Sequence, residues 1–182
     1  MSELDAEWER RVAEAAERAG ATGRADIADY LRLRAENDLA RAAGVAWLLD
    51  AFTALADEAL LHGADLRILR DEEHSFRVSH STMIGSRLLL RCGQVRALNV
   101  EAGWPRAPSH GVVRGGGLAR ARRSHFGDRG ADEELLLVKP NDEDAPRWIL
   151  VADPPDAHTR RAAPRESFDE SRARAHVEKL VG

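Results

Sequence analysis

The chain has 182 residues, of which 43% are hydrophobic and 32% are charged, and its formal net charge is -4. A chain of this length and composition can bury ~70% of the surface that its unfolded form exposes, which excludes a disordered tail and removes the need for disulfides. Residues 1–20 are charged throughout and no apolar run reaches the ~20 residues of a membrane span, so we expect a cytoplasmic protein with no signal peptide and no membrane contact.

The first third of the sequence predicts helices. Apolar residues recur at intervals of three and four over residues 4–19, which is typical of an amphipathic helix. A second helix is expected to begin near Asp26, and a further one to cover residues 45–60. Gly63 supplies the signal that ends this helical segment.

From residue 64 onward the apolar spacing changes to two, which predicts strands. The acidic cluster Asp71-Glu72-Glu73 is interpreted as a turn between two short strands. Residues 87–91 and 95–104 are predicted to form a hairpin around Gly93. Further strands are expected at 112–113, 118–126, 135–138 and 148–151. The short connections between them favour an antiparallel meander.

The predicted fold class is therefore α+β. It consists of a twisted antiparallel sheet of about five to seven strands, with an α-helical amino-terminal segment and a carboxy-terminal helix packed on one face. We interpret the whole chain, residues 1–182, as a single domain made of four segments. These are the helical segment 1–62, the sheet 63–152, a linker 153–165 and the carboxy-terminal helix 166–182.

Charge is distributed unevenly along these segments. The net charge is -6 over residues 1–62, +6 over residues 63–130 and -4 over residues 131–182. All but two of the 27 basic residues are arginines, which together with the abundant alanine is typical of a bacterial chain from a GC-rich genome. The excess of basic residues lies in residues 63–130, so candidate binding arginines are sought in that segment.

A glycine-rich turn followed by an arginine-rich strand is the main candidate for a binding site. Alternation along the strand 118–126 puts Arg120 and Arg122 on one face, and Arg123 and His125 on the other. Together with Arg114 before the glycines, these guanidinium groups suit a phosphate or carboxylate ligand. The alternative is that the arginines pair with Glu133, Glu134, Asp142 or Glu143 of the same chain. Internal pairing of Arg120 and Arg122 would argue against a binding face.

Two further candidate residues lie on the preceding strand. Glu101 projects from the face opposite Leu98 and Val100, where it is either solvated or lines a cavity. Trp104, followed by Pro105 and Arg106, forms an aromatic and cationic corner or closes one end of the core, and the second use is the commoner one for tryptophan.

The segment 38–50 is similar to the turn region of helix-turn-helix DNA-binding proteins. The resemblance rests on Leu39-Ala40-Arg41-Ala42-Ala43-Gly44-Val45, and it implies a turn at Gly44 followed by a recognition helix. Asp50 stands where that helix should bury an aliphatic side chain, and the segment is acidic, which opposes attraction to phosphate. A nucleic-acid partner is therefore not expected.

The histidines and the single cysteine offer little chemistry by spacing alone. No pair has the spacing of a metal motif, and Cys92 has no partner for a disulfide or a zinc site, so we expect no metal and no cofactor. A small hydrolase or phosphate-handling enzyme would need His80, His110, His125, Glu101 and an arginine to converge in one pocket.

The sequence thus predicts a non-enzymatic interaction or ligand-binding module. Its ligand-binding residues would be Arg114, Arg120, Arg122, Arg123, His125, Trp104 and Glu101, and its partner an anionic small molecule or protein. We also expect a homodimer that forms through the helices. The DNA-binding regulator and the small hydrolase remain the alternatives.

Overall fold

The computed structural model describes residues 3–141, 144–151 and 166–182. The chain divides into two compact units, Met1–Ala42 and Ala43–Gly182. Each unit has its own set of packed elements. The interpretation of the whole chain as one domain stays a prediction, and the predicted linker 153–165 lies outside the described residues.

The first unit is a helical hairpin. It contains α1 (Glu3–Ala21) and the first half of α2 (Ala25–Leu61). The turn between them requires a left-handed residue, which Gly23 supplies with a φ of 75°. Ala16 and Ala28 are the only buried hydrophobic residues among the described side chains of this unit. Among its described side chains, the hairpin therefore buries little apolar surface.

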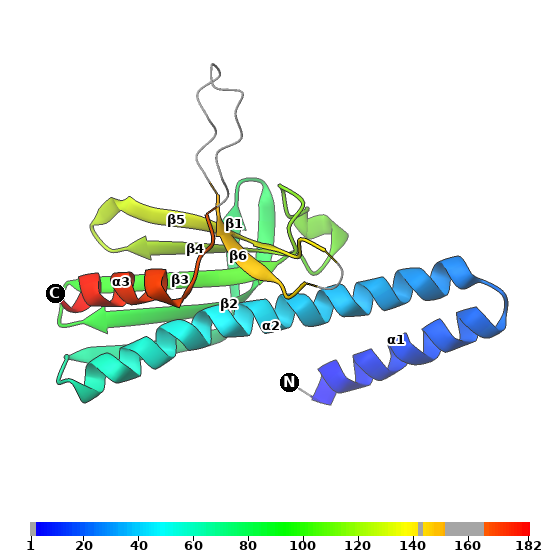
Figure 1. Cartoon of the computed structure of the whole chain (residues 1–182), viewed down its shortest axis with the longest axis horizontal. Helices are drawn as coiled ribbons and strands as arrows, with labels where there is room; N and C mark the ends of the chain where they lie inside the picture. The colour runs from blue at the N-terminus through cyan, green and yellow to red at the C-terminus, as the bar shows by residue number, and fades with distance from the viewer. Residues whose placement is uncertain (1–2, 142–143, 152–165) are drawn as a thin grey trace, which may run out of the picture. The chain divides into compact units, whose positions relative to one another are not determined.

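The second helix, α2, is continuous over 37 residues, as Figure 1 shows. The two separate helices expected here are thus one helix, and the predicted helix-turn-helix turn at Gly44 is wrong. Gly44 serves close packing instead, because a Cβ atom at this position would lie 2.5 Å from a methyl group of Leu137. Its carbonyl oxygen also accepts a 2.9 Å hydrogen bond from the indole of the buried Trp148.

The second unit contains a six-stranded antiparallel sheet in which every strand pairs with its neighbours in sequence (Figure 1). The predicted meander is confirmed. Its strands are β1 (Leu66–Val78), β2 (Ser81–Cys92), β3 (Arg96–Trp104), β4 (Ala119–His125), β5 (Asp128–Val138) and β6 (Arg147–Leu150), with a short 3-10 helix η1 (Pro108–His110) after β3.

Two local predictions about this sheet are wrong. Residues 71–73 do not form a turn, because β1 runs on through them and accommodates them in a β-bulge between Asp71 and His74. The chain reverses later, at Ser79, which has a positive φ of 55°. Residues 112–113 form no strand and belong to the connection between β3 and β4.

Helices cover one face of the sheet, called here the core face. Leu48, Leu49 and Phe52 of α2 are completely buried in the same cluster as Leu88, Leu98 and Val100 of the sheet. The carboxy-terminal helix α3 (Glu170–Val181) adds Ala173, Val177 and Leu180 to this cluster, after an amino-terminal cap in which Asp169 accepts from the amide of Arg172. The predicted α+β class, with helices from both ends of the chain on one face, is confirmed.

By length and composition alone, α2 is apolar enough to span a membrane. Its second half is also a core helix of the second unit, since three of its side chains are completely buried there. Burial in a folded core accounts for the apolar side chains at these three positions.

Candidate functional site

The arginine-rich strand β4 presents different side chains to the two faces of the sheet. Arg123 and His125 pair with Val100 and Leu98, so they lie on the core face. Arg122 pairs with Glu101, so it lies on the opposite face, called here the outer face. The predicted alternation along this strand is confirmed.

On the outer face, Arg122 and His74 converge on the buried carboxylate of Glu101. Arg122 donates to one carboxylate oxygen at 2.8 Å, and His74 Nε2 lies 2.9 Å from the other. His74 can reach across β2 because its partner there is Gly85, which has no side chain. Burial tends to raise the pKa of Glu101, but Arg122 and His74 outweigh it and lower that pKa. Glu101 is therefore an ionised carboxylate that joins β1 to β4.

Arg120 is also engaged within the chain. It lies 3.0 Å from the carboxylate of Glu134 on β5 and donates at 3.1 Å to the carbonyl oxygen of Arg114. Arg114 itself is exposed in the turn before the glycines. Arg120 and Arg122 thus adopt the internally paired arrangement that argues against these two residues as an open binding face. Asp142 and Glu143, the other expected partners, lie outside the described residues.

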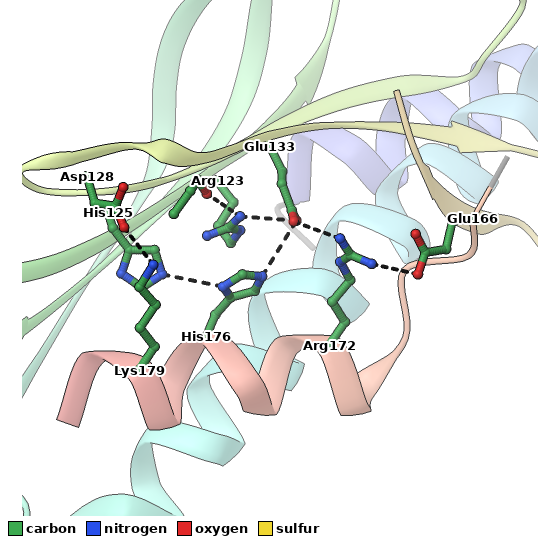
Figure 2. A network of polar contacts seen from close by, with 9 residues as sticks. Arg123, His125, Asp128, Glu133, Glu166, Arg172, His176 and Lys179 are labelled. Carbon is green, nitrogen blue, oxygen red and sulfur yellow. Dashed lines mark hydrogen bonds and ion pairs between the residues drawn. The ribbon is translucent and has the colours of Figure 1, made fainter. Parts of the chain in front are cut away.

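On the core face, Arg123 is completely buried beneath α3. Its guanidinium lies 3.1 Å from the Glu133 carboxylate and also donates to the carbonyl of Ala131. Arg172 of α3 donates to the same carboxylate at 2.9 Å. Figure 2 shows how these side chains from β4, β5 and α3 point toward Glu133. One carboxylate therefore holds two arginines between the sheet and the helix.

Two histidines complete this network (Figure 2). His125 Nε2 lies 3.4 Å from His176 Nδ1, and His176 Nε2 lies 3.6 Å from Glu133. Burial, together with the charges of Arg123, His176 and Lys179, lowers the pKa of His125 to about 4. Burial opposes ionisation of Glu133, but its contacts with His176, Arg172 and Arg123 lower its pKa to about 2. At neutral pH the network thus contains a neutral His125 and an ionised Glu133.

Trp104 both packs against the core and carries a cation over its ring, the two arrangements considered for it from the sequence. The indole packs against the core cluster and is half-buried. The guanidinium carbon of Arg106 lies over the ring, 5.1 Å from its centroid. Trp104 therefore closes one end of the core while its free face carries a cation.

The residues required for a hydrolase pocket do not gather in one place. Hydrogen bonding between Ser81 and Val112 joins the turn that carries His80 to the loop that carries His110. Glu101 and His125, however, project from opposite faces of the sheet. Within the described residues, no three His, Cys, Asp or Glu side chains are grouped in a way that could hold a metal ion.

The sequence analysis missed a group of exposed side chains at one end of the outer face. Arg67 of β1 stands directly opposite Arg91 of β2, and both are exposed. In the part of the chain that the structure describes, neither arginine forms an ion pair. Leu69, which is 52% exposed, follows Arg67 two residues along the same face of β1, and Phe126, which is 73% exposed, lies beyond β3, where its amide donates to Ala97.

We call this group the basic apolar patch. Leu69 of β1 stands opposite Leu89 of β2, and Leu89 stands opposite Asn99 of β3. Arg91 of β2 stands opposite Ala97 of β3, whose carbonyl oxygen accepts a hydrogen bond from the amide of Phe126. The patch consists of Arg67, Leu69, Arg87, Leu89, Arg91 and Phe126. Alternation along residues 66–69 placed Arg67 and Leu69 together, but the pairing of Arg67 with Arg91 depends on a register that only the folded sheet reveals.

Comparison of the chain with protein-family models, with curated proteins and with solved structures finds no match. The candidate ligand-binding role of Arg114, Arg120, Arg122, Arg123, His125, Trp104 and Glu101 stays a prediction.

Proposed function

We propose that this protein is a non-enzymatic interaction module, and that the basic apolar patch on its outer sheet face binds an acidic protein segment that also carries apolar side chains. The observation that carries the proposal is the pairing of Arg67 with Arg91. Like charges directly opposite each other destabilise an antiparallel pair. A carboxylate from a partner would relieve this repulsion.

The apolar members of the patch favour a protein partner over a small anion. Leu69 places exposed apolar surface beside Arg67, and Phe126 adds a second exposed apolar side chain beyond β3. A phosphate or a free carboxylate would leave this surface in water, whereas an acidic segment with leucine or phenylalanine side chains would cover it. Arg87, whose Nε donates to Asn99 at 2.6 Å, is held in a fixed position at the border of the patch.

Other arginines of the sheet are less suited to this role. Arg120, Arg122 and Arg123 each have a carboxylate within 3.1 Å. A partner would have to break these internal pairs before it gained new ones. Arg67 and Arg91, which form no ion pair with any described residue, carry no such cost.

The test is a titration followed by fluorescence anisotropy. A labelled peptide rich in glutamate and leucine is expected to bind the wild-type protein and to bind the double variant R67Q/R91Q about tenfold more weakly, since loss of two exposed ion pairs costs about 1–2 kcal/mol. A labelled oligothymidylate of similar charge tests the nucleic-acid alternative. A matched control is the double variant R77Q/R147Q, which removes two exposed arginines of the same sheet outside the patch.

The proposal requires the peptide to distinguish the two double variants. Equal binding to both, or no binding to the wild type, would contradict the patch. Tighter binding of the oligothymidylate than of the peptide would show that the anionic partner is a nucleic acid and would overturn the proposed protein partner.

A further inference from the structure

The helical hairpin Met1–Ala42 leaves large apolar side chains of α2 in water. Tyr30 is 61% exposed and Leu33 is 52% exposed, while only two alanines are buried among the described side chains of the unit. Helices in water depend on tertiary packing for most of their stability, and units of about 40 residues usually need oligomerisation or a cross-link. The hairpin is therefore short of apolar contacts.

Four residues of α2 follow the spacing of a coiled-coil seam, of which Tyr30 and Leu33 are exposed and Asn37 and Ala40 are half-buried. Tyr30, Leu33, Asn37 and Ala40 are separated by three, four and three residues, which corresponds to successive a and d positions of a heptad. A single asparagine at an a position is a known device for fixing register and oligomeric state.

This seam points away from α1. The side of α2 that faces α1 carries Leu31 and Ala35, which line a hollow together with Val12 and Ala16 of α1. At about 100° per residue, these positions lie on the opposite side of the helix from the seam. α1 therefore leaves the seam open to a partner.

Charged residues beside the seam select the partner and its direction. Asp29 and Glu36 occupy the g positions, and Arg34 and Arg41 occupy the e positions. In a parallel, in-register pair of identical helices, Asp29 would face Arg34 of the second copy and Glu36 would face Arg41 of the second copy. In an antiparallel pair, acids would face acids and arginines would face arginines. The sign pattern thus complements a parallel copy of this same helix.

The charged residues beside the seam already have contacts within the chain. Arg34 and Arg41 each contact Asp38, and Asp29 contacts Arg32, in ion pairs within one helix. The exposed Asp29–Arg32 pair contributes little to stability, whereas Arg41 is 25% exposed in its pair with Asp38, so a partner must replace that contact.

We propose that α2 pairs through Tyr30, Leu33, Asn37 and Ala40 with the same seam of a second copy, as a parallel homodimer. The interface is self-complementary and closed, as expected for a two-fold dimer.

Sedimentation over a concentration series tests the interface. The full chain is expected to show a monomer–dimer equilibrium, and L33E is expected to weaken the dimer about tenfold or more, because a charge replaces a buried leucine. L39E is the matched control, since Leu39 is 65% exposed on the same helix but lies about 180° around it from Tyr30. Circular dichroism establishes that both variants keep their helices.

Cross-linking tests the direction of the helices. In A40C, oxidation is expected to join the two copies through Cys at position 40 only if the helices are parallel and in register. Wild-type protein serves as the control because its own Cys92 is buried. A wild-type chain that stays monomeric, a dimer that L33E and L39E affect equally, or a dimer in which A40C does not cross-link would each overturn the proposal.

Discussion

The guanidinium of Arg123, completely buried under α3, lies 3.1 Å from the carboxylate of Glu133 on the neighbouring strand. Taking a charge out of water is costly unless another charge compensates it. Glu133 compensates Arg123 and also contacts Arg172 and His176 of α3. Glu133 therefore supplies the counter-charge for the buried arginine and joins α3 to the sheet, in addition to the apolar contacts of the helix.

Replacement of this carboxylate is the first prediction. E133Q is expected to lower the free energy of unfolding by about 3–5 kcal/mol, because it leaves Arg123 charged, buried and without a counter-charge. Urea denaturation at pH 7 measures the effect. The control E134Q removes a more exposed acid, 46% accessible and paired with Arg120, and should cost less than about 1 kcal/mol. Similar losses in the two variants would contradict a special role for Glu133.

Stability is also expected to fall when the pH drops from about 6.5 to about 4. The folded pKa of His125 is about 4, below its ordinary value of 6.5, so below pH 6.5 the unfolded chain binds a proton that the folded chain does not. The contribution of His125 is complete above pH 6.5 and amounts to at most about 3 kcal/mol. Stability falls further below pH 4.5. Glu133 has a folded pKa of about 2, so in this range the unfolded chain binds a proton at Glu133 that the folded chain does not bind.

The variant H125Q isolates the histidine contribution. Denaturation curves at several pH values should show a flatter dependence between pH 6.5 and 4 for H125Q than for the wild type, with the two curves converging in slope below pH 4. An unchanged slope between pH 6.5 and 4 would mean that His125 does not control acid stability.

Two glycine-to-alanine substitutions are expected to have opposite effects. A Cβ atom at Gly85 would lie 2.0 Å from the carbonyl oxygen of Ala102, so G85A should destabilise the sheet by more than about 2 kcal/mol. Gly20 lies in α1 with no atom within 4 Å of its added Cβ, so G20A should stabilise the helix by about 0.5–1 kcal/mol. Thermal unfolding followed by circular dichroism checks both signs. A neutral G85A would show that β2 and β3 can separate at this point.

Reversal of one charge in the basic apolar patch should separate stability from binding. R67E would place opposite charges where Arg67 and Arg91 now face each other, and should raise the free energy of unfolding by about 0.2–1 kcal/mol. The same change should abolish binding of the acidic peptide. R77E is the control, since Arg77 pairs with Thr82 and has no like charge opposite. Loss of stability in R67E would indicate that the two arginines do not repel each other in the folded protein.

The sequence was sufficient for the features that depend on local periodicity. Alternation along β4 correctly separated Arg122 from Arg123, because neighbouring strand residues always point to opposite faces. The helical amino-terminal segment and the meander followed from apolar spacing and short connections in the same way. These features need no knowledge of which distant residues meet.

Features that depend on distant partners could not be predicted. Gly44 resembles a turn glycine, and only the approach of Leu137 reveals that it is a packing glycine within a helix. Glu133 was among the expected carboxylate partners of these arginines, but the burial of Arg123 also depends on α3, which lies far along the sequence. The patch arginines Arg67 and Arg91 have no local motif, since their meeting is set by strand register alone.

The three acids at residues 71–73 have a further consequence for how the sheet meets other chains. They occupy β1, one of its two edges, and their bulge interrupts the row of backbone groups that another strand could use. At the other edge, β6 is only four residues long, and the segment around Ser167 already hydrogen-bonds to it. The bulge divides the free edge of β1 into two short stretches and the segment around Ser167 covers β6, so both edges are less suited to strand addition than a long regular edge would be.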